Sequence, residues 1–196
     1  PLVEESMMNQ KRLMLKELTS TAVSIVDSYV GLEQRGAMTL DEAQSKAAME
    51  LKTMRYGPEN KDYFFITDMH PNMVMHPYRS DLTGQDLTHY TESEDSSDVP
   101  IFVEIIKLVR AQQHGYLEYL WQWKDDPSIT APKMTYVEGV EEWQWVIGTG
   151  VYFEDVQQEL HRLENTLYRV FLLITLGLVG VMTYGMAQSK VSQNRQ

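Results

Sequence analysis

Two side chains in the middle of the sequence could bind a small anion. Lys133 opens the segment KMTYV after Pro132, and His76 is followed by Pro77. A buried ammonium group needs a negative partner, which an external carboxylate could supply. A lysine beside a proline is also common at the solvated end of a strand, and a single histidine on a strand is more often a hydrogen-bonded core residue. The residues alone leave both interpretations open.

Three aromatic-rich runs flank these two residues. They are DYFFITD at 62–68, YLEYLWQW at 116–123 and WQWVIGTGVY at 143–152. Their alternation is typical of strands, on which apolar side chains ordinarily face packed helices. Four aromatic residues nevertheless carry enough surface to wall a small pocket, and glycines in the last run leave room beside them. The candidate wall consists of Tyr63, Phe65, Tyr119, Trp121 and Gly148, with Gly150 next to it.

Tyr136 is a further candidate ligand contact. It lies three positions after Lys133, and therefore on the opposite face of a regular strand. The two side chains reach one ligand only if Lys133 curls over the edge of the sheet.

The composition excludes several classes of protein. A net charge of −11 would repel nucleic acid, so we expect no nucleic-acid partner. Cysteine is absent and the five histidines have no metal-ligand spacing, which argues against a metal site. No nucleophile elbow, phosphate-binding loop, dinucleotide fingerprint or paired-carboxylate cleft is present. We therefore expect no catalytic residue, no cofactor and no enzyme activity.

Helices and strands follow one another in an order that predicts an α+β fold. A capping box at Thr39 and Glu42 starts the second helix, and Gly57 with Pro58 is expected to close it. Asp98 and Pro100 are expected to start the third helix and Gly115 to end it. We expect helices at 4–33, 40–54 and 100–115, strands at 63–67, 73–76, 116–123, 133–137 and 143–152, and loops at 81–98 and 124–132. The five strands predict a central antiparallel sheet with flanking helices.

The first helix carries an apolar stripe with two possible partners. Met8, Leu15, Ala22 and Val26 follow helical and heptad-like spacings. The stripe could pair with a second copy of the chain in a homodimer, or it could cover the sheet of its own domain. The sequence does not decide between these alternatives.

The C-terminal segment predicts a membrane span. Val170 to Ser189 is free of charge, and twenty helical residues rise roughly 30 Å, the thickness of a bilayer's hydrocarbon core. A buried amphipathic helix would need a polar face, and none is visible. Asp155 is expected to cap the helix that leads into this span, and the basic residues beyond it place the C-terminus in the cytoplasm. The chain opens at Pro1 without a methionine, so we expect a fragment.

Several motifs together resemble the single Cache domain of type 2, an extracellular sensor domain of bacterial receptors. They are YFFITD, VMHP followed by LTGQDL, PKMTYV and WVIGTGVY, and the resemblance covers residues 33–156. It implies a PAS-like Cache fold with a long N-terminal helix, a ligand pocket on one sheet face, and flanking membrane helices. It also implies an output module of a chemoreceptor, histidine kinase or cyclase.

These expectations combine into one division of the chain and one function. We expect an N-terminal signalling or dimerisation helix (1–32), a sensor domain (33–156), a juxtamembrane helix (157–169), a transmembrane helix (170–189) and a cytoplasmic start (190–196). The sensor would face the periplasm from the bacterial inner membrane. It would bind a small organic acid such as acetate or propionate through Lys133, Tyr136 and His76. The alternative is a membrane-anchored module that binds a partner protein through its long helices, for which a pocket would have no use.

Overall fold

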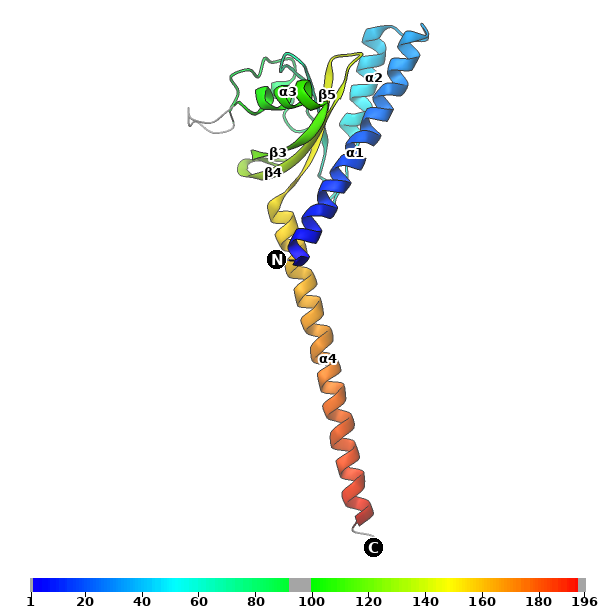
Figure 1. Ribbon diagram of the computed structural model, residues 1–196, viewed down its shortest axis with the longest axis vertical. Coiled ribbons are helices and arrows are strands. Elements are labelled where there is room, and N and C mark those ends of the chain that lie inside the picture. The colour runs from blue at the N-terminus through cyan, green and yellow to red at the C-terminus, as the bar shows by residue number, and fades with distance from the viewer. Residues whose placement is uncertain (1, 92–99, 194–196) are drawn as a thin grey trace. The chain divides into compact units, whose positions relative to one another are not determined.

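A computed structural model describes residues 2–91 and 100–193, with side chains given for most of them (Figure 1). The chain forms two compact units, residues 1–154 and 155–196. The first unit contains α1 (Leu2–Gln34), α2 (Leu40–Thr53), β1 (Phe64–Asp68), β2 (Met73–Met75), a 3-10 turn η1 (Ser80–Leu82), α3 (Ile101–Gln112), β3 (His114–Trp123), β4 (Asp126–Val140) and β5 (Trp145–Tyr152).

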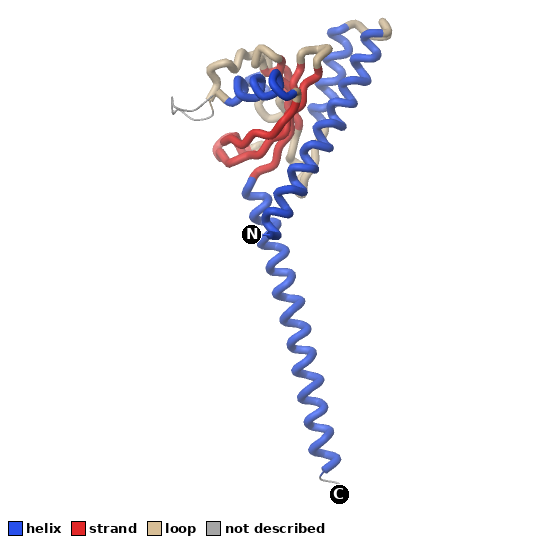
Figure 2. The backbone as a smooth tube through the Cα atoms, in the orientation of Figure 1, coloured by secondary structure: helices blue, strands red, loops and turns tan. Residues whose placement is uncertain are grey.

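The five strands form one antiparallel sheet with the order β2-β1-β5-β4-β3. Helices α1 and α2 run side by side along one face, and α3 lies on the other (Figures 1 and 2). Successive side chains of β1 point to opposite faces of the sheet, so this strand contacts the helices on both faces. Phe64 and Ile66 pack with α1 and α2, whereas Phe65 packs with α3. The predicted α+β class and the five-stranded antiparallel sheet are thus confirmed.

The apolar stripe of α1 belongs to the core of its own chain. Leu15, Ala22 and Val26 have no exposed surface. Ala22 and Val26 pack with α2 and the sheet, and Leu15 packs with Met134 of β4. Leu15, Ala22 and Val26 therefore belong to the core of their own domain and are not open to a second copy. Met8, in contrast, is only partly buried.

The predicted helix ends were partly wrong. The capping box of α2 is present, with both Thr39–Glu42 hydrogen bonds formed. The helix ends at Thr53, however, followed by an extended Met54, so Gly57 and Pro58 do not close it.

The end of α3 was also misplaced. Gln113 takes the left-handed conformation (φ 67°) and ends the helix, while its N–H donates to the carbonyl oxygen of Val109 at 2.8 Å. Gly115 lies inside β3, where an added Cβ would meet the side chain of Leu108 at 2.8 Å. A larger residue there would require the side chain of Leu108 to move. Pro100 precedes the first turn of α3, and Asp98 lies outside the described residues.

The expected loop at 124–132 was wrong as well. Strand β4 begins at Asp126 and pairs with β3, so only a short turn separates the two strands. Its first residues are mostly exposed because the tip of the hairpin has no helix over it. A strand that is solvated on both faces has no alternation of polar and apolar residues, and this is why its pattern resembles a loop. The other strands lie within two residues of their predicted ends.

Helix α4 (Phe153–Gln193) begins at the end of the first unit and makes up the described part of the second. Asp155 thus lies in its first turn and does not precede it. Within the described residues, Phe153–Met182 is the one helical stretch whose length and composition suit a membrane span, and its most apolar 18-residue window has a mean hydropathy of 1.6 with no residue buried. Large apolar side chains such as Leu167 and Phe171 are exposed along it. An apolar C-terminal helix is therefore present, as the sequence predicts.

A buried cationic cavity as candidate ligand site

Lys133 is fully buried on the α3 side of the sheet, at 1% exposure. Its Nζ donates a hydrogen bond to the hydroxyl oxygen of Tyr63 at 2.9 Å. The same nitrogen lies 4.1 Å from the ring centroid of Tyr63 and 5.3 Å from that of Tyr152. Among the described residues, no carboxylate lies within ion-pair distance of this ammonium group. Lys133 is thus held by aromatic rings and one neutral oxygen.

Burial has a direct effect on the charge of Lys133. Removing the ammonium group from water lowers its pKa to about 7, and the negative charge of Asp62 only partly opposes this effect. A second buried lysine shows the contrast. Lys124 is also 1% exposed, but its Nζ lies 3.2 Å from a carboxylate oxygen of Glu59. Lys124 therefore has a counter-charge within the protein, whereas Lys133 is suited to a negative charge supplied by a ligand.

His76 presents a second buried donor. It follows β2 and is 2% exposed. Its Nδ1 accepts hydrogen bonds from the backbone N–H groups of Tyr78 at 3.2 Å and Arg79 at 2.9 Å. Burial, followed by the positive charge of Lys133, lowers the pKa of His76 well below its usual value, so the ring is neutral. A neutral ring that accepts at Nδ1 carries its proton on Nε2. That nitrogen is buried without a partner among the described groups.

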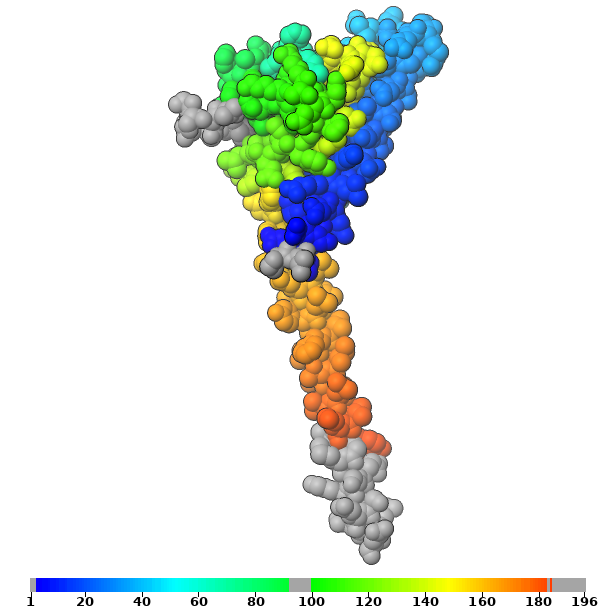
Figure 3. Space-filling model, in the orientation of Figure 1, coloured from blue at the N-terminus to red at the C-terminus, as the bar shows by residue number. Residues whose placement is uncertain are grey.

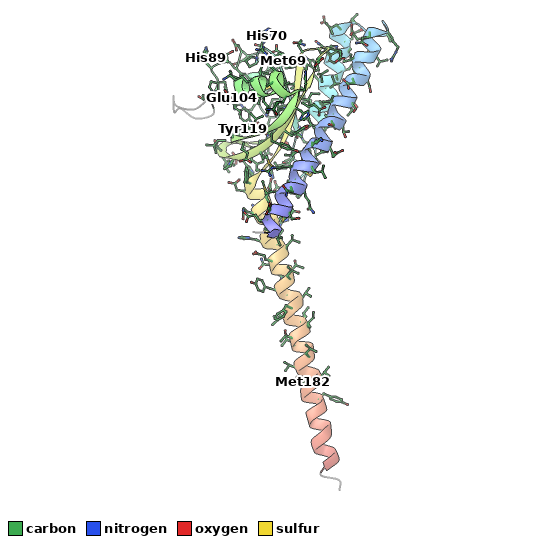
Figure 4. The ribbon with its side chains drawn as sticks, in the orientation of Figure 1. Met69, His70, His89, Glu104, Tyr119 and Met182 are labelled. Carbon is green, nitrogen blue, oxygen red and sulfur yellow. The ribbon has the colours of Figure 1, made fainter. Side chains whose placement is uncertain are left out.

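These two donors meet at a narrow cavity that is too tight to admit a water-sized sphere. Because even one water molecule needs more room than this, the lining side chains must move apart to admit a ligand, which favours a ligand of only a few heavy atoms. The cavity is lined by Phe65, His76, Phe102, Tyr119, Trp121 and Lys133, none of which is acidic. Figure 4 labels Tyr119 on β3, and in the space-filling view α3 and β3 pack together without a wide opening on the face shown (Figure 3).

The glycines of β5 shape this site in different ways. An added Cβ on Gly148 would lie 2.4 Å from the ring of Phe65, so the wall residue itself fills the space that Gly148 leaves. A Cβ on Gly150 would lie 2.8 Å from Cε of Lys133 and 2.5 Å from Oγ1 of Thr135. Gly150 thus makes room for the stem of Lys133.

The structure brings most of the predicted site residues together. Five of them line the cavity: Lys133, His76, Phe65, Tyr119 and Trp121. Tyr63 accepts the hydrogen bond of Lys133. Gly148 does not line the cavity, and Phe65 fills the space that it leaves. Phe102 could not be singled out from the sequence, since it belongs to the apolar face of an amphipathic helix.

Tyr136 does not line the cavity either. It packs with Leu15, Met134 and Val151 on the α1 face of the sheet. Successive β4 side chains alternate between faces, so Lys133 and Tyr136 point to opposite sides. The expectation that Tyr136 shares a ligand with Lys133 was therefore wrong.

The site is suited to binding and not to metal chemistry. It offers one ammonium group, one imidazole N–H and an aromatic lining. Among the residues described, no group of three or more His, Cys, Asp or Glu side chains could hold a metal ion. Such an arrangement can retain a small organic anion with a short apolar tail.

Comparison with protein families gives a match to the model of the single Cache domain 2 over residues 7–165. The chain belongs to this family. The match begins within α1 and extends into α4, so it includes the sheet, the cavity and the helices on both faces.

Two curated relatives are signalling proteins. The chain is 35% identical over 147 residues to the methyl-accepting chemotaxis protein McpP of Pseudomonas putida, covering 75% of this chain and 26% of that protein. It is 28% identical over 153 residues to the sensor histidine kinase MctS of Rhizobium johnstonii, covering 78% of this chain and 31% of that protein. The chain therefore spans about a quarter to a third of the length of these relatives.

Two solved structures have the same fold. One, described as a structural basis for carboxylic acid recognition by a Cache chemosensory domain, has a TM-score of 0.69 and 35% identity, covering 76% of this chain and 97% of its own. The other, a periplasmic sensor domain of a chemotaxis protein, has a TM-score of 0.69 and 32% identity, covering 75% and 98%. The Cache fold predicted from the motifs is confirmed.

Proposed function

We propose that this Cache domain is the extracytoplasmic sensor of a bacterial transmembrane receptor and binds a small monocarboxylate, such as acetate or propionate. The observation that carries the proposal is the pair of buried donors at one cavity. Lys133 has no carboxylate partner among the described residues, and the Nε2–H of His76 has no acceptor there. We expect no catalytic activity from the residues of this site.

The physical argument rests on the cost of burying a charge. An ammonium group taken out of water without an anion is strongly disfavoured, which is why the pKa of Lys133 falls. A bound carboxylate would supply the missing charge and could also accept the N–H of His76. The absence of an acid from the lining argues against amino acids as ligands, because their ammonium group would have no partner. The relative described as a carboxylic acid sensor supports this ligand class.

Signal relay would use β5. Lys133 pairs with Tyr152 across β4 and β5, and Nζ of Lys133 lies over the ring of Tyr152. Tyr152 is the last residue of β5, and α4 starts at the next residue. A ligand that draws Lys133 into the cavity would shift the end of β5, and this shift would pass into α4.

The rest of the receptor follows from this arrangement. We propose that α4 crosses the inner membrane through residues 170–189, with 157–169 as a juxtamembrane helix and 190–196 in the cytoplasm. The sensor part, 33–156, would lie in the periplasm, and an output module such as that of a chemoreceptor or kinase would lie beyond. A homodimer would have to use a face of α1 other than the buried stripe, such as the one that carries the exposed Leu13. The alternative of a pocketless interaction module leaves the two unpartnered donors without a role.

Calorimetric titration of the domain with sodium acetate and propionate tests the proposal. Lys133→Met keeps the stem and removes the charge, so we expect affinity to fall by about 2 to 5 kcal/mol. Lys124→Met is the matched control, because it removes an equally buried ammonium group that already has Glu59 as partner. Its ligand affinity should stay within about twofold of the parent value, a margin of roughly 0.4 kcal/mol. The proposed site would be refuted if Lys133→Met bound the acids as tightly as the parent does. It would also be refuted if the parent bound no small carboxylate.

A further inference from the structure

The cavity has a polar end and an apolar end. Lys133 and His76 supply the donors, whereas Phe102 supplies only a phenyl ring. Trp121 lies between them, with its ring centroid 5.7 Å from that of His76 and 5.6 Å from that of Phe102. Among the described residues, the ring neighbours of Phe102 are Trp121 and Tyr90. A carboxylate at Lys133 would therefore direct its hydrocarbon tail along Trp121 toward Phe102.

The ring of Phe102 is held firmly in place. It is 3% exposed and packs edge-on against Trp121 and against Tyr90, at a centroid distance of 5.9 Å. The hydroxyl oxygen of Tyr90 accepts a hydrogen bond from Arg79 at 2.9 Å. Further along α3, Ile105 is fully buried and anchors the helix on the sheet. A ring held by this many neighbours moves aside only at a cost, since interiors are closely packed.

On this basis we propose that Phe102, on the first turn of α3, determines the longest carboxylic acid that the sensor accepts. The inference rests on the proposed function and goes beyond it, because it assigns chain-length specificity to one residue outside the donor pair. The tail gains affinity for each methylene that enters the cavity and loses it when the chain meets the phenyl ring. Specificity is then set by a steric stop, in addition to the charge at Lys133.

A titration series of straight-chain acids tests this assignment. The probes are sodium acetate, propionate, butyrate and pentanoate with the parent domain, Phe102→Ala and Ile105→Ala. In the parent, affinity should rise about fourfold for each methylene that fits, at about 0.8 kcal/mol per buried CH₂, and then fall. In Phe102→Ala the maximum should move to a longer acid, and the pentanoate-to-propionate affinity ratio should rise at least about tenfold, which is equivalent to about 1.4 kcal/mol.

Ile105→Ala is the matched control, because it removes a buried side chain from the same helix and the same core cluster that does not itself line the cavity. Its affinity ratio should equal that of the parent. Phe102→Leu retains more of the core volume and should give a pentanoate-to-propionate affinity ratio between those of the parent and Phe102→Ala. It keeps the test valid if the alanine variant does not fold. An unchanged order of acids in both Phe102 variants would overturn the inference while leaving the proposed function in place. Absence of binding by every acid in the parent would overturn both.

Discussion

Ligand affinity should depend on pH through Lys133. The bound carboxylate needs the ammonium form, and burial lowers the pKa of this group to about 7 in the free domain. Above that pH a smaller fraction of the protein is competent to bind, and binding takes up a proton. His76 contributes no slope, since its pKa lies well below the usual value and its ring stays neutral. The pKa of Tyr63 is raised, so its hydroxyl also stays neutral.

The size of the effect follows from the pKa. Above about pH 8 each further pH unit should weaken apparent binding about tenfold, which is about 1.4 kcal/mol. Between about pH 7 and about pH 9 the loss is about fiftyfold, or about 2.3 kcal/mol, because half of the Lys133 side chains are already neutral at about pH 7. Toward about pH 4 the ligand's own carboxyl group takes up a proton, so binding should weaken there as well.

Calorimetry in two buffers with different ionisation enthalpies measures this linkage. The difference between the binding heats in the two buffers should correspond to the uptake of about one proton per ligand at about pH 8. At about pH 6 it should correspond to almost none. Lys124→Met should show the same dependence as the parent. Lys133→Arg, if it binds, should show none, because a guanidinium group stays charged. Strong binding with an affinity independent of pH from about 6 to about 9 would refute the argument that Lys133 titrates in this range.

The stability of the ligand-free domain should have the opposite pH dependence. The pKa of Lys133 is 10.5 in the unfolded chain and about 7 when folded, so between these values the unfolded chain binds more protons. The free energy of unfolding should therefore rise as pH increases from about 7 to about 10.5, and this contribution is lost as pH falls through 7. Lys133→Met should remove that part of the slope, as urea unfolding at several pH values would show. An unaltered slope would mean that Lys133 does not carry it.

Three further predictions concern packing and the C-terminal helix. Gly150→Ala should destabilise the domain by about 1 to 3 kcal/mol and weaken ligand binding, because its Cβ would displace Lys133, whereas Gly177→Ala has open space and should do neither. Leu15→Ala should cost about 2 to 5 kcal/mol in chemical denaturation, while Leu13→Ala, on the exposed side of α1, should stay within about 0.5 kcal/mol; equal effects would contradict the assignment of the stripe to the core. A domain ending at Glu164 should remain soluble without detergent while the full chain requires it, and equal solubility would refute the membrane span.

Local and periodic features were predictable from the sequence. The alternation in β1 and β3, the capping box at Thr39 and the charge-free segment after Arg169 depend on neighbours within one or two turns of chain. Errors arose where the local pattern was weak or misleading. Gln113 took over the role expected of Gly115, and the solvated half of β4 lacked the alternation that marks a half-buried strand.

Residue types also indicated the chemistry of the site, since a lysine and a histidine among aromatic strands predict an anion pocket. Whether Lys133 was a solvated strand end or a buried cation depended on what lay beneath it. Its ammonium group meets Tyr63, seventy positions earlier, and the same cavity is closed by Phe102 of α3. Tyr136 lay close to Lys133 in sequence and yet faces α1. The sequence determined which groups are available and the period of each element. Only the tertiary structure decided which of them share a cavity, because burial and partnership depend on contacts between residues far apart in the chain.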